Sequence, residues 1–274
     1  MATHRWTGAA DGVTLTTVGN WFNETAAATT TSFAAGDILF ITSSTVDITA
    51  GLDFGSTNLE AVYISFNKNL GTSSTSASFN VSNAATSKLV YTGTGQFCNI
   101  TARAAGAITL IQAFHAQGKL RISGGATVTN LEIGPTATVE LDATGTVTNL
   151  YQGGGSLVAA AGTAFTIVDI LAGTMLTSRS IATARVLGSN SAIFTIDAAA
   201  FTTNLLVSGG ARVNHQSTGT ITAGTIGSNS RIDAAGSLRT FTVTNFTRFV
   251  GAYFLDSESV APTYTNAVVK RCYV

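Results

Sequence analysis

The chain has 274 residues, a formal net charge of zero from 14 basic and 14 acidic side chains, and only 10% charged residues. Because a typical soluble protein has roughly 25% charged residues, Thr, Ser, Asn and Gly must cover much of this surface. The 45% hydrophobic content argues against a disordered chain. The balanced charge argues against a nucleic-acid-binding stripe and against a polybasic membrane-binding cluster.

Residues 1–60 carry both tryptophans, Trp6 and Trp21, and show no clear nineteen-residue repeat. We expect this region to be an N-terminal cap or attachment region, with strands at 37–41 and 46–49. The first residues contain no apolar h-region, so we expect no secretory signal peptide and synthesis in a cytoplasm. The sequence has no apolar run of about eighteen residues that would predict a membrane span.

A repeat of nineteen residues follows and sets the predicted architecture. Residues 127–145 read TVTNLEIGPTATVELDATG, residues 146–164 read TVTNLYQGGGSLVAAAGTA, and the pattern returns in 201–219 and 220–237. Each copy contains short strands in which apolar residues alternate with Thr and Glu. One copy cannot bury its apolar face alone, but copies stacked about 4.8 Å apart form a continuous core.

We therefore predict an all-β fold, a single-stranded parallel β-helix (β-solenoid) with rungs of about nineteen residues over 61–237. The usual hand of parallel crossovers favours right-handed coiling. The inward positions of one rung are predicted to be Leu131, Ile133, Val139 and Leu141. Residues 238–274 are rich in aromatic residues and are predicted to be a C-terminal aromatic cap or oligomerisation segment.

Three columns of residues mark the predicted register. Asparagine recurs at a Thr-Asn-apolar corner, in a structural corner ladder of Asn130, Asn149, Asn204 and Asn245. Asn tolerates positive φ, and stacked Asn side chains can bond to one another. A second column contains glycines at Gly134, Gly153, Gly173, Gly188, Gly209 and Gly227. A third contains Asp197, Asn214 and Asp233, which we expect to cap the turns where strands end.

Solenoids that cleave sugars usually carry two or three carboxylates close together on one outer face. Glu132, Glu140 and Asp142 all fall in one rung. A shift of nineteen residues places Arg121 beside Glu140, so an exposed Arg121–Glu140 ion pair is the simplest interpretation. We therefore predict no catalytic residue and no enzyme activity.

Metal and cofactor sites have no support in the sequence. The two cysteines, Cys98 and Cys272, are predicted to be free thiols because a disulfide framework needs more. The histidines His4, His115 and His215 are far apart, and no cysteine motif accompanies them. No phosphate-binding glycine loop or nucleophile motif is present, so we predict no metal-binding and no cofactor-binding residues.

The opening of the chain resembles the openings of many bacteriophage virion proteins and large surface β-solenoids. The residues that carry the likeness are W-T-G at 6–8, G-N-W at 19–21 and A-G-D at 35–37 before an apolar strand. The Thr-, Asn- and Gly-rich rungs are similar to those of phage β-helix proteins such as tailspikes, fibres and capsid decoration proteins. This resemblance implies a virion part, commonly a homotrimer, that is delivered by cell lysis.

These observations lead to one function and two alternatives. We expect a non-enzymatic structural protein of a phage virion, a capsid decoration or head fibre protein. Its partners would be capsid or tail proteins and further copies of itself, with a trimer favoured, and neither nucleic acid nor membrane. The first alternative is a tail fibre or tailspike-like receptor protein that binds or cleaves host surface glycan. The second is a bacterial surface adhesin.

Overall fold

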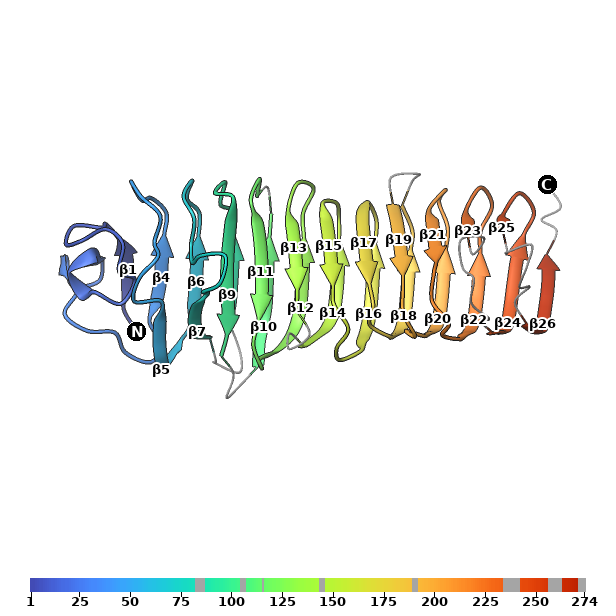
Figure 1. The fold of residues 1–274 in the computed structure, drawn as a ribbon, viewed down its shortest axis with the longest axis horizontal. Helices are drawn as coiled ribbons and strands as arrows, with labels where there is room; N and C mark the ends of the chain where they lie inside the picture. The colour runs from blue at the N-terminus through green and yellow to red at the C-terminus, as the bar shows by residue number, and fades with distance from the viewer. Residues whose placement is uncertain are drawn as a thin grey trace. The chain divides into compact units, whose positions relative to one another are not determined.

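The computed structural model describes residues 1–81, 87–103, 107–114, 116–142, 146–188, 192–233, 242–255 and 263–270. These residues form an all-β parallel β-solenoid of about 10 turns with rungs of about 19 residues, which confirms the predicted fold class. The chain divides into two compact units, residues 1–147 and 148–274. Figure 1 shows the successive coils within each unit, and the helix of the described residues is one short 3-10 segment, η1 (Val18–Asn20).

Unit 1 contains two sheets, and each coil contributes one strand to each. The first sheet has the order β12-β10-β8-β6-β4-β1-β2-β3, and the second has the order β13-β11-β9-β7-β5. The first-sheet strands are β1 (Thr3–Trp6), β2 (Trp21–Asn23), β3 (Ala28–Thr29), β4 (Ile38–Ile41), β6 (Ala61–Ile64), β8 (Lys88–Tyr91), β10 (Ala107–Ala113) and β12 (Thr127–Ile133). The second-sheet strands are β5 (Asp53–Leu59), β7 (Ala77–Val81), β9 (Phe97–Ala102), β11 (Lys119–Ser123) and β13 (Thr138–Leu141).

Unit 2 repeats this arrangement. Its first sheet has the order β26-β24-β22-β20-β18-β16-β14, and its second has the order β25-β23-β21-β19-β17-β15. The first-sheet strands are β14 (Thr146–Gln152), β16 (Phe165–Ile170), β18 (Ile181–Val186), β20 (Thr202–Val207), β22 (Ile221–Ile226), β24 (Thr242–Phe249) and β26 (Thr263–Lys270). The second-sheet strands are β15 (Ser156–Ala159), β17 (Gly173–Thr177), β19 (Ala192–Ile196), β21 (Arg212–His215), β23 (Arg231–Asp233) and β25 (Tyr253–Leu255).

The core of each unit is a set of stacked apolar columns. In unit 1, one column runs through successive register partners Leu39, Val62, Leu89, Ile111 and Leu131, and all are buried. The four predicted inward residues of the rung at 127–145 are also buried. Because each coil hides the apolar side of its neighbour, burial and the interstrand backbone ladder stabilise the same stacked arrangement.

Six of the first-sheet strands bend where two successive residues face outward. In β14, Val147 and Leu150 are buried while Thr148 and Asn149 between them are partly exposed. The same interruption of alternation recurs in β12, β16, β18, β20 and β22. The bend turns the strand without ending it, so the predicted Thr-Asn corners lie inside strands.

Close backbone approach explains two of the predicted glycine positions. An added Cβ at Gly188 would lie 1.6 Å from the Leu171 carbonyl oxygen, so no side chain fits there. Gly173 has φ of +87°, a conformation that L-residues rarely adopt. Both positions lie at the junction where the chain passes from the first to the second sheet of unit 2.

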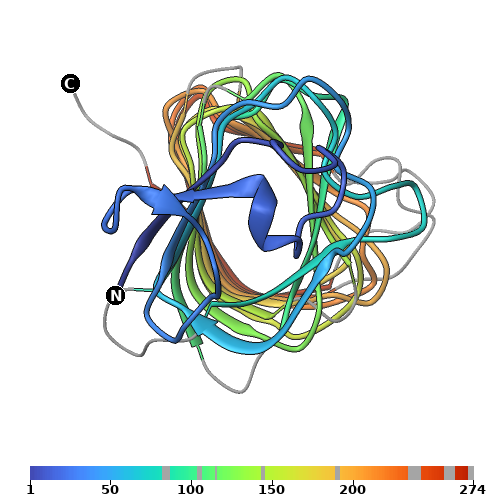
Figure 2. The same cartoon turned by 90° about the vertical axis from the view of Figure 1, so that its left-hand side faces the viewer.

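The N-terminal residues adopt a different topology from the coils. Strand β1 pairs in parallel with β4 but antiparallel with β2, which in turn pairs antiparallel with β3. Figure 2 shows η1 and the chain around it lying across the end of the first coils. Trp6 and Trp21 are buried there, with ring centroids 5.3 Å apart. The expected strand at 37–41 is β4, whereas 46–49 contains only an isolated bridge at Ile48.

The parallel ladder extends beyond the predicted solenoid bounds of 61–237. Strands β4 and β5 belong to the stretch assigned to the N-terminal region. Strands β24, β25 and β26 continue the ladders within the stretch assigned to the C-terminal segment. The roles of the two end regions as caps stay predictions.

Candidate functional site

The outer face of the second sheet in unit 1 presents a regular grid of polar side chains. The alternation of β9, β11 and β13 turns every second residue outward. The ladder registers place Asn99 beside Arg121, and Arg121 beside Glu140. Two residues further along the strands, Thr101 lies beside Ser123. The Asp142 N–H donates to the Ile122 carbonyl oxygen, which brings Asp142 next to this row.

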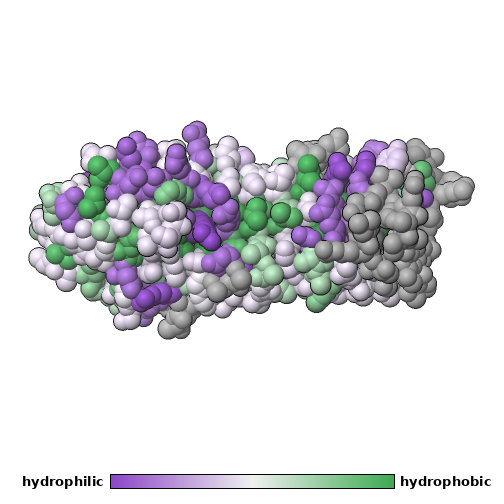
Figure 3. Space-filling model, viewed as in Figure 1, coloured by the Kyte–Doolittle hydropathy of each residue, from purple (hydrophilic) through white to green (hydrophobic). Residues whose placement is uncertain are grey.

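A loop overhangs this grid and turns it into a hollow of about 200 Å³. The lining consists entirely of polar residues: Ser73, Ser74, Thr75, Ser76, Asn99, Arg121, Ser123 and Asp142. We call it the Arg121 hollow. Figure 3 shows hydrophilic residues gathered on the face of unit 1 that is turned toward the viewer.

The overhanging loop is held by its own hydrogen bonds. The Thr72 N–H donates to the Thr75 carbonyl oxygen (2.8 Å), and the Thr75 N–H donates to Thr72 Oγ1 (3.0 Å). Asn99 Nδ2 donates to the Thr72 carbonyl oxygen (2.5 Å), which ties the loop to β9. Gly71 opens the loop with φ of +84°. The shape of the hollow is therefore fixed by the fold.

A chain of hydroxyl groups crosses the hollow. Ser76 Oγ lies 2.5 Å from Thr101 Oγ1, which lies 3.0 Å from Ser123 Oγ. Ser123 Oγ donates its proton to the Ile100 carbonyl oxygen (3.2 Å). Since each hydroxyl has one proton, Thr101 must then donate to Ser123 and Ser76 to Thr101. All three hydroxyl protons are used within the chain, so these hydroxyl oxygens can only accept further hydrogen bonds.

The expected Arg121–Glu140 ion pair is not formed. Glu140 Oε1 instead lies 2.6 Å from Lys119 Nζ, although Arg121 is its direct register neighbour. Diagonal neighbours two residues along a strand are within reach of long side chains. Arg121 consequently keeps no hydrogen-bond or ion-pair partner among the residues that the structure describes.

The three candidate carboxylates are not brought together. Glu132 lies on β12 in the other sheet, where its Oε2 accepts a bond of 2.8 Å from Gln112 Nε2. Glu140 on β13 and Asp142 directly after that strand share one outer face, but Glu140 forms an ion pair with Lys119. Of the three, only Asp142 lines the hollow.

The four asparagines predicted as a corner ladder lie at the strand bends. Asn130 Nδ2 donates to the Thr109 carbonyl oxygen (3.3 Å), across the ladder to the neighbouring coil. In unit 2, Asn149 and Asn204 share a column but are separated by Ile167 and Thr183, so the column is not a run of successive asparagines.

The conformational reason given for this column is wrong. None of the four asparagines has positive φ; the non-glycine residues of the described chain that do are Ala27, Ala198 and Asn229. Asn204 and Asn245 instead line a second hollow of about 360 Å³ on the outer face of unit 2.

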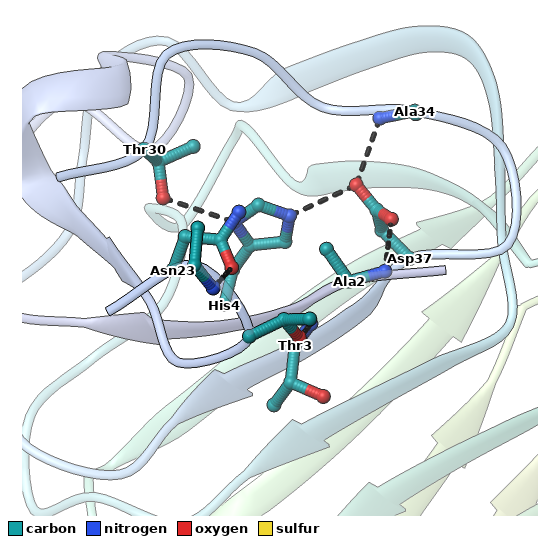
Figure 4. Close-up of polar contacts among 9 residues, drawn as sticks. Ala2, Thr3, His4, Asn23, Thr30, Ala34 and Asp37 are labelled. Atoms are coloured by element: carbon teal, nitrogen blue, oxygen red, sulfur yellow. Dashed lines mark hydrogen bonds and ion pairs between the residues drawn. The ribbon is translucent and has the colours of Figure 1, made fainter. Parts of the chain in front are cut away.

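A histidine between a hydroxyl and a carboxylate lies near the N-terminus and superficially resembles a catalytic arrangement (Figure 4). His4 Nδ1 lies 2.9 Å from Thr30 Oγ1, and His4 Nε2 lies 2.9 Å from Asp37 Oδ2. All three residues are at most 2% exposed, so no substrate reaches them. Burial raises the pKa of Asp37, but the N–H groups of Ala34 and Ala2 and the His4 side chain outweigh it and hold the pKa below its ordinary value. The network is a structural element of unit 1.

The described residues offer little basis for metal binding or thiol chemistry. They contain no group of three or more His, Cys, Asp and Glu residues placed to hold a metal ion. Cys98 is a buried free thiol whose pKa is raised by burial, while Cys272 and His115 lie outside the described residues. No helix in the described part of the chain has the length and apolarity needed to span a membrane.

No known protein family, curated protein or solved structure matches this chain. Function is therefore inferred from the fold and from the chemistry of its outer faces. Sequence reasoning named Arg121 and Asp142 but not as members of one hollow. It missed Asn99, Ser123 and the loop 73–76, because that loop belongs to coils whose lengths depart from nineteen residues.

Proposed function

We propose that this chain is a non-enzymatic structural protein of a bacteriophage virion, a capsid decoration or head fibre protein. The observation that carries the proposal is the parallel ladder that joins successive coils throughout each unit. In such a ladder the backbone polar groups bond between neighbouring coils, and the core is continuous from coil to coil. This construction suits a rigid, protease-resistant part of a particle exposed to the environment.

The way the outer-face carboxylates are paired supports the non-enzymatic part of the proposal. Asp53 bonds to Arg103 (2.9 Å), Glu140 to Lys119 (2.6 Å) and Asp169 to Arg185 (2.5 Å). A general acid in glycoside hydrolysis needs a raised pKa and a second carboxylate at a defined distance. Each of these three carboxylates faces a cation rather than a second carboxylate.

Exposed apolar side chains in unit 2 support self-association. Val158 and Leu176 are direct register partners on the outer face of β15 and β17, and they are 40% and 41% exposed. Leu171 and Leu187 are also exposed, at junctions between the sheets of unit 2. Neighbouring exposed apolar residues are more typical of interfaces than of free surface. We propose that they contribute to a homotrimer.

The oligomeric state and the binding partner together test the proposal. Light scattering on the purified full chain should give a trimer, and the double variant Val158→Ser/Leu176→Ser should weaken it. The chain should cosediment with the capsid proteins encoded by neighbouring genes. A monomer that binds neither capsid nor tail proteins would contradict the proposal. Release of oligosaccharide from host glycan that is lost in Glu140→Gln would overturn the non-enzymatic assignment.

A tail fibre or tailspike-like receptor protein is the second candidate. The observation that favours it is the Arg121 hollow, a polar depression of the size of a small ligand on an exposed face. Cosedimentation with tail proteins instead of capsid proteins would favour this candidate over a head decoration protein.

A further inference from the structure

Arg121 is exposed, has no ion-pair partner among the described residues, and lies in a hollow whose shape the fold fixes. Arg121 lines the hollow and has no hydrogen-bond or ion-pair partner in the described part of the chain, whereas the neighbouring cation Lys119 is paired with Glu140. We propose that the Arg121 hollow is a binding site for one carboxylate-bearing sugar residue, with Arg121 as the ligand of the carboxylate. The site goes beyond the structural role proposed above and does not depend on it.

The choice of a carboxylate follows from the guanidinium. Arginine presents a planar fork of N–H donors that matches a carboxylate in two parallel hydrogen bonds. The five N–H donors of Arg121 have no acceptor in the described residues, although polar groups surround them. Neither of the nearest carboxylates of the grid pairs with Arg121. Glu140 pairs with Lys119, and no ion pair joins Arg121 to Asp142. An incoming carboxylate would supply the missing acceptor.

The choice of a sugar follows from the rest of the lining. The protons of Ser76, Thr101 and Ser123 are used within the hydroxyl chain, so these groups accept further hydrogen bonds. Asp142 lines the hollow as well, and a carboxylate accepts hydrogen bonds. The hollow thus has one strong donor and several acceptors, which matches a ligand with one carboxylate and several hydroxyl donors. No apolar or aromatic side chain lines it, so an apolar ligand gains nothing there.

Size and rigidity limit the ligand further. The volume of about 200 Å³ is below the roughly 300–1,000 Å³ of pockets for drug-sized ligands, so a single ring is the unit seated. The loop over the hollow is already held by bonds between Thr72 and Thr75 and by Asn99. Because little has to be ordered on binding, a small ligand can bind measurably.

Titration calorimetry and NMR on the full chain test this site with defined probes. Methyl glucuronide carries the carboxylate and hydroxyls, methyl glucoside carries the hydroxyls alone, and acetate carries the carboxylate alone. We expect methyl glucuronide to bind at least about tenfold more tightly than either of the other two probes. In Arg121→Gln we expect about a tenfold loss for methyl glucuronide and no change for methyl glucoside.

The matched control is Arg185→Gln, which removes an exposed arginine that is paired with Asp169 in unit 2 and should leave binding unchanged. Asp142→Asn should weaken the binding of methyl glucuronide and of methyl glucoside to a similar extent. Equal binding of acetate and methyl glucuronide would show a simple anion site and overturn the proposal. Unchanged affinity in Arg121→Gln, or no methyl glucuronide binding at millimolar concentration, would also overturn it. None of these results bears on whether the chain forms a trimer or binds a capsid.

Discussion

Leu131 of β12 lies directly beside Ile111 of β10 in the parallel ladder of unit 1, and neither side chain is exposed to solvent. The pair is one step of a buried column that continues to Leu89. Each member therefore contributes its own burial and covers the residue on the neighbouring coil. The stability of the fold is distributed over such pairs, because each coil contacts mainly its neighbours.

Shortening one member of this column should destabilise the unit. Leu131→Ala removes a buried side chain and leaves a cavity, so the free energy of unfolding should fall by about 2–5 kcal/mol. Urea unfolding monitored by circular dichroism measures this change. Thr129→Ala, on the outward side of the same strand, is the control and should stay within about 0.5 kcal/mol of the wild type. Equal effects of the two variants would contradict the assigned facing of β12.

A methyl group should be tolerated at one glycine and not at another. Gly188→Ala would place its Cβ 1.6 Å from the Leu171 carbonyl oxygen, so the backbone must move, at a cost of about 2 kcal/mol or more. At Gly125 an added Cβ meets nothing within 4 Å, so Gly125→Ala should be nearly neutral. Thermal unfolding of both variants measures the difference. An unchanged stability of Gly188→Ala would show that the coils of Gly188 and Leu171 are not in close contact there.

His215 should make the protein less stable in mild acid. Burial lowers the pKa of this side chain from 6.5 to about 4. The unfolded chain therefore binds a proton first as the pH falls, so stability is complete above pH 6.5 and declines toward pH 4, by about 3 kcal/mol in total. Urea unfolding between these pH values should show the decline in the wild type and a flatter profile in His215→Leu. Identical profiles would exclude a buried neutral histidine.

Asp37 should govern a separate window at lower pH. Its folded-state pKa lies below the ordinary value, so its contribution is present above about pH 4 and is lost as the pH falls through the folded value. Asp37→Asn places an amide where the Ala34 and Ala2 N–H groups need an acceptor. We expect a loss of at least about 1 kcal/mol at neutral pH and a shallower acid transition. A transition unchanged by Asp37→Asn would show that other carboxylates control acid unfolding.

The repeat was enough to predict the fold, because the stacking of coils follows from a regular spacing. Shifting Glu140 back by nineteen residues correctly gives Arg121 as its register neighbour. Matching of similar residues fails where it departs from that spacing. Asp197 was expected in one column with Asn214, but the register places Asn214 beside Thr195, two residues earlier. Strands β19 and β21 keep the nineteen-residue spacing, so the error came from aligning two similar residue pairs that are seventeen residues apart.

The candidate site was only partly predictable, for a related reason. The register shows which residues are neighbours, but it does not show which of two nearby cations forms an ion pair with a carboxylate. Glu140 is opposite Arg121 but forms its ion pair with the diagonal neighbour Lys119. The loop at 72–76 has no counterpart in the repeat, because the coils of this part of unit 1 are longer. A hollow formed by a loop of one coil over the strands of later coils needs the three-dimensional structure.

In-register stacking of coils is the central claim, and an engineered disulfide tests it most directly. Thr195 and Asn214 are outward-facing register partners on β19 and β21. Parallel partners lie about 4.8 Å apart, within the range that a disulfide spans. Thr195→Cys/Asn214→Cys should therefore oxidise to an intramolecular disulfide in the folded protein, detected by mass spectrometry. In Thr195→Cys/Arg212→Cys the partners are roughly 8 Å apart, and no disulfide should form. Efficient bridging in the second variant but not the first would contradict the register on which the fold depends.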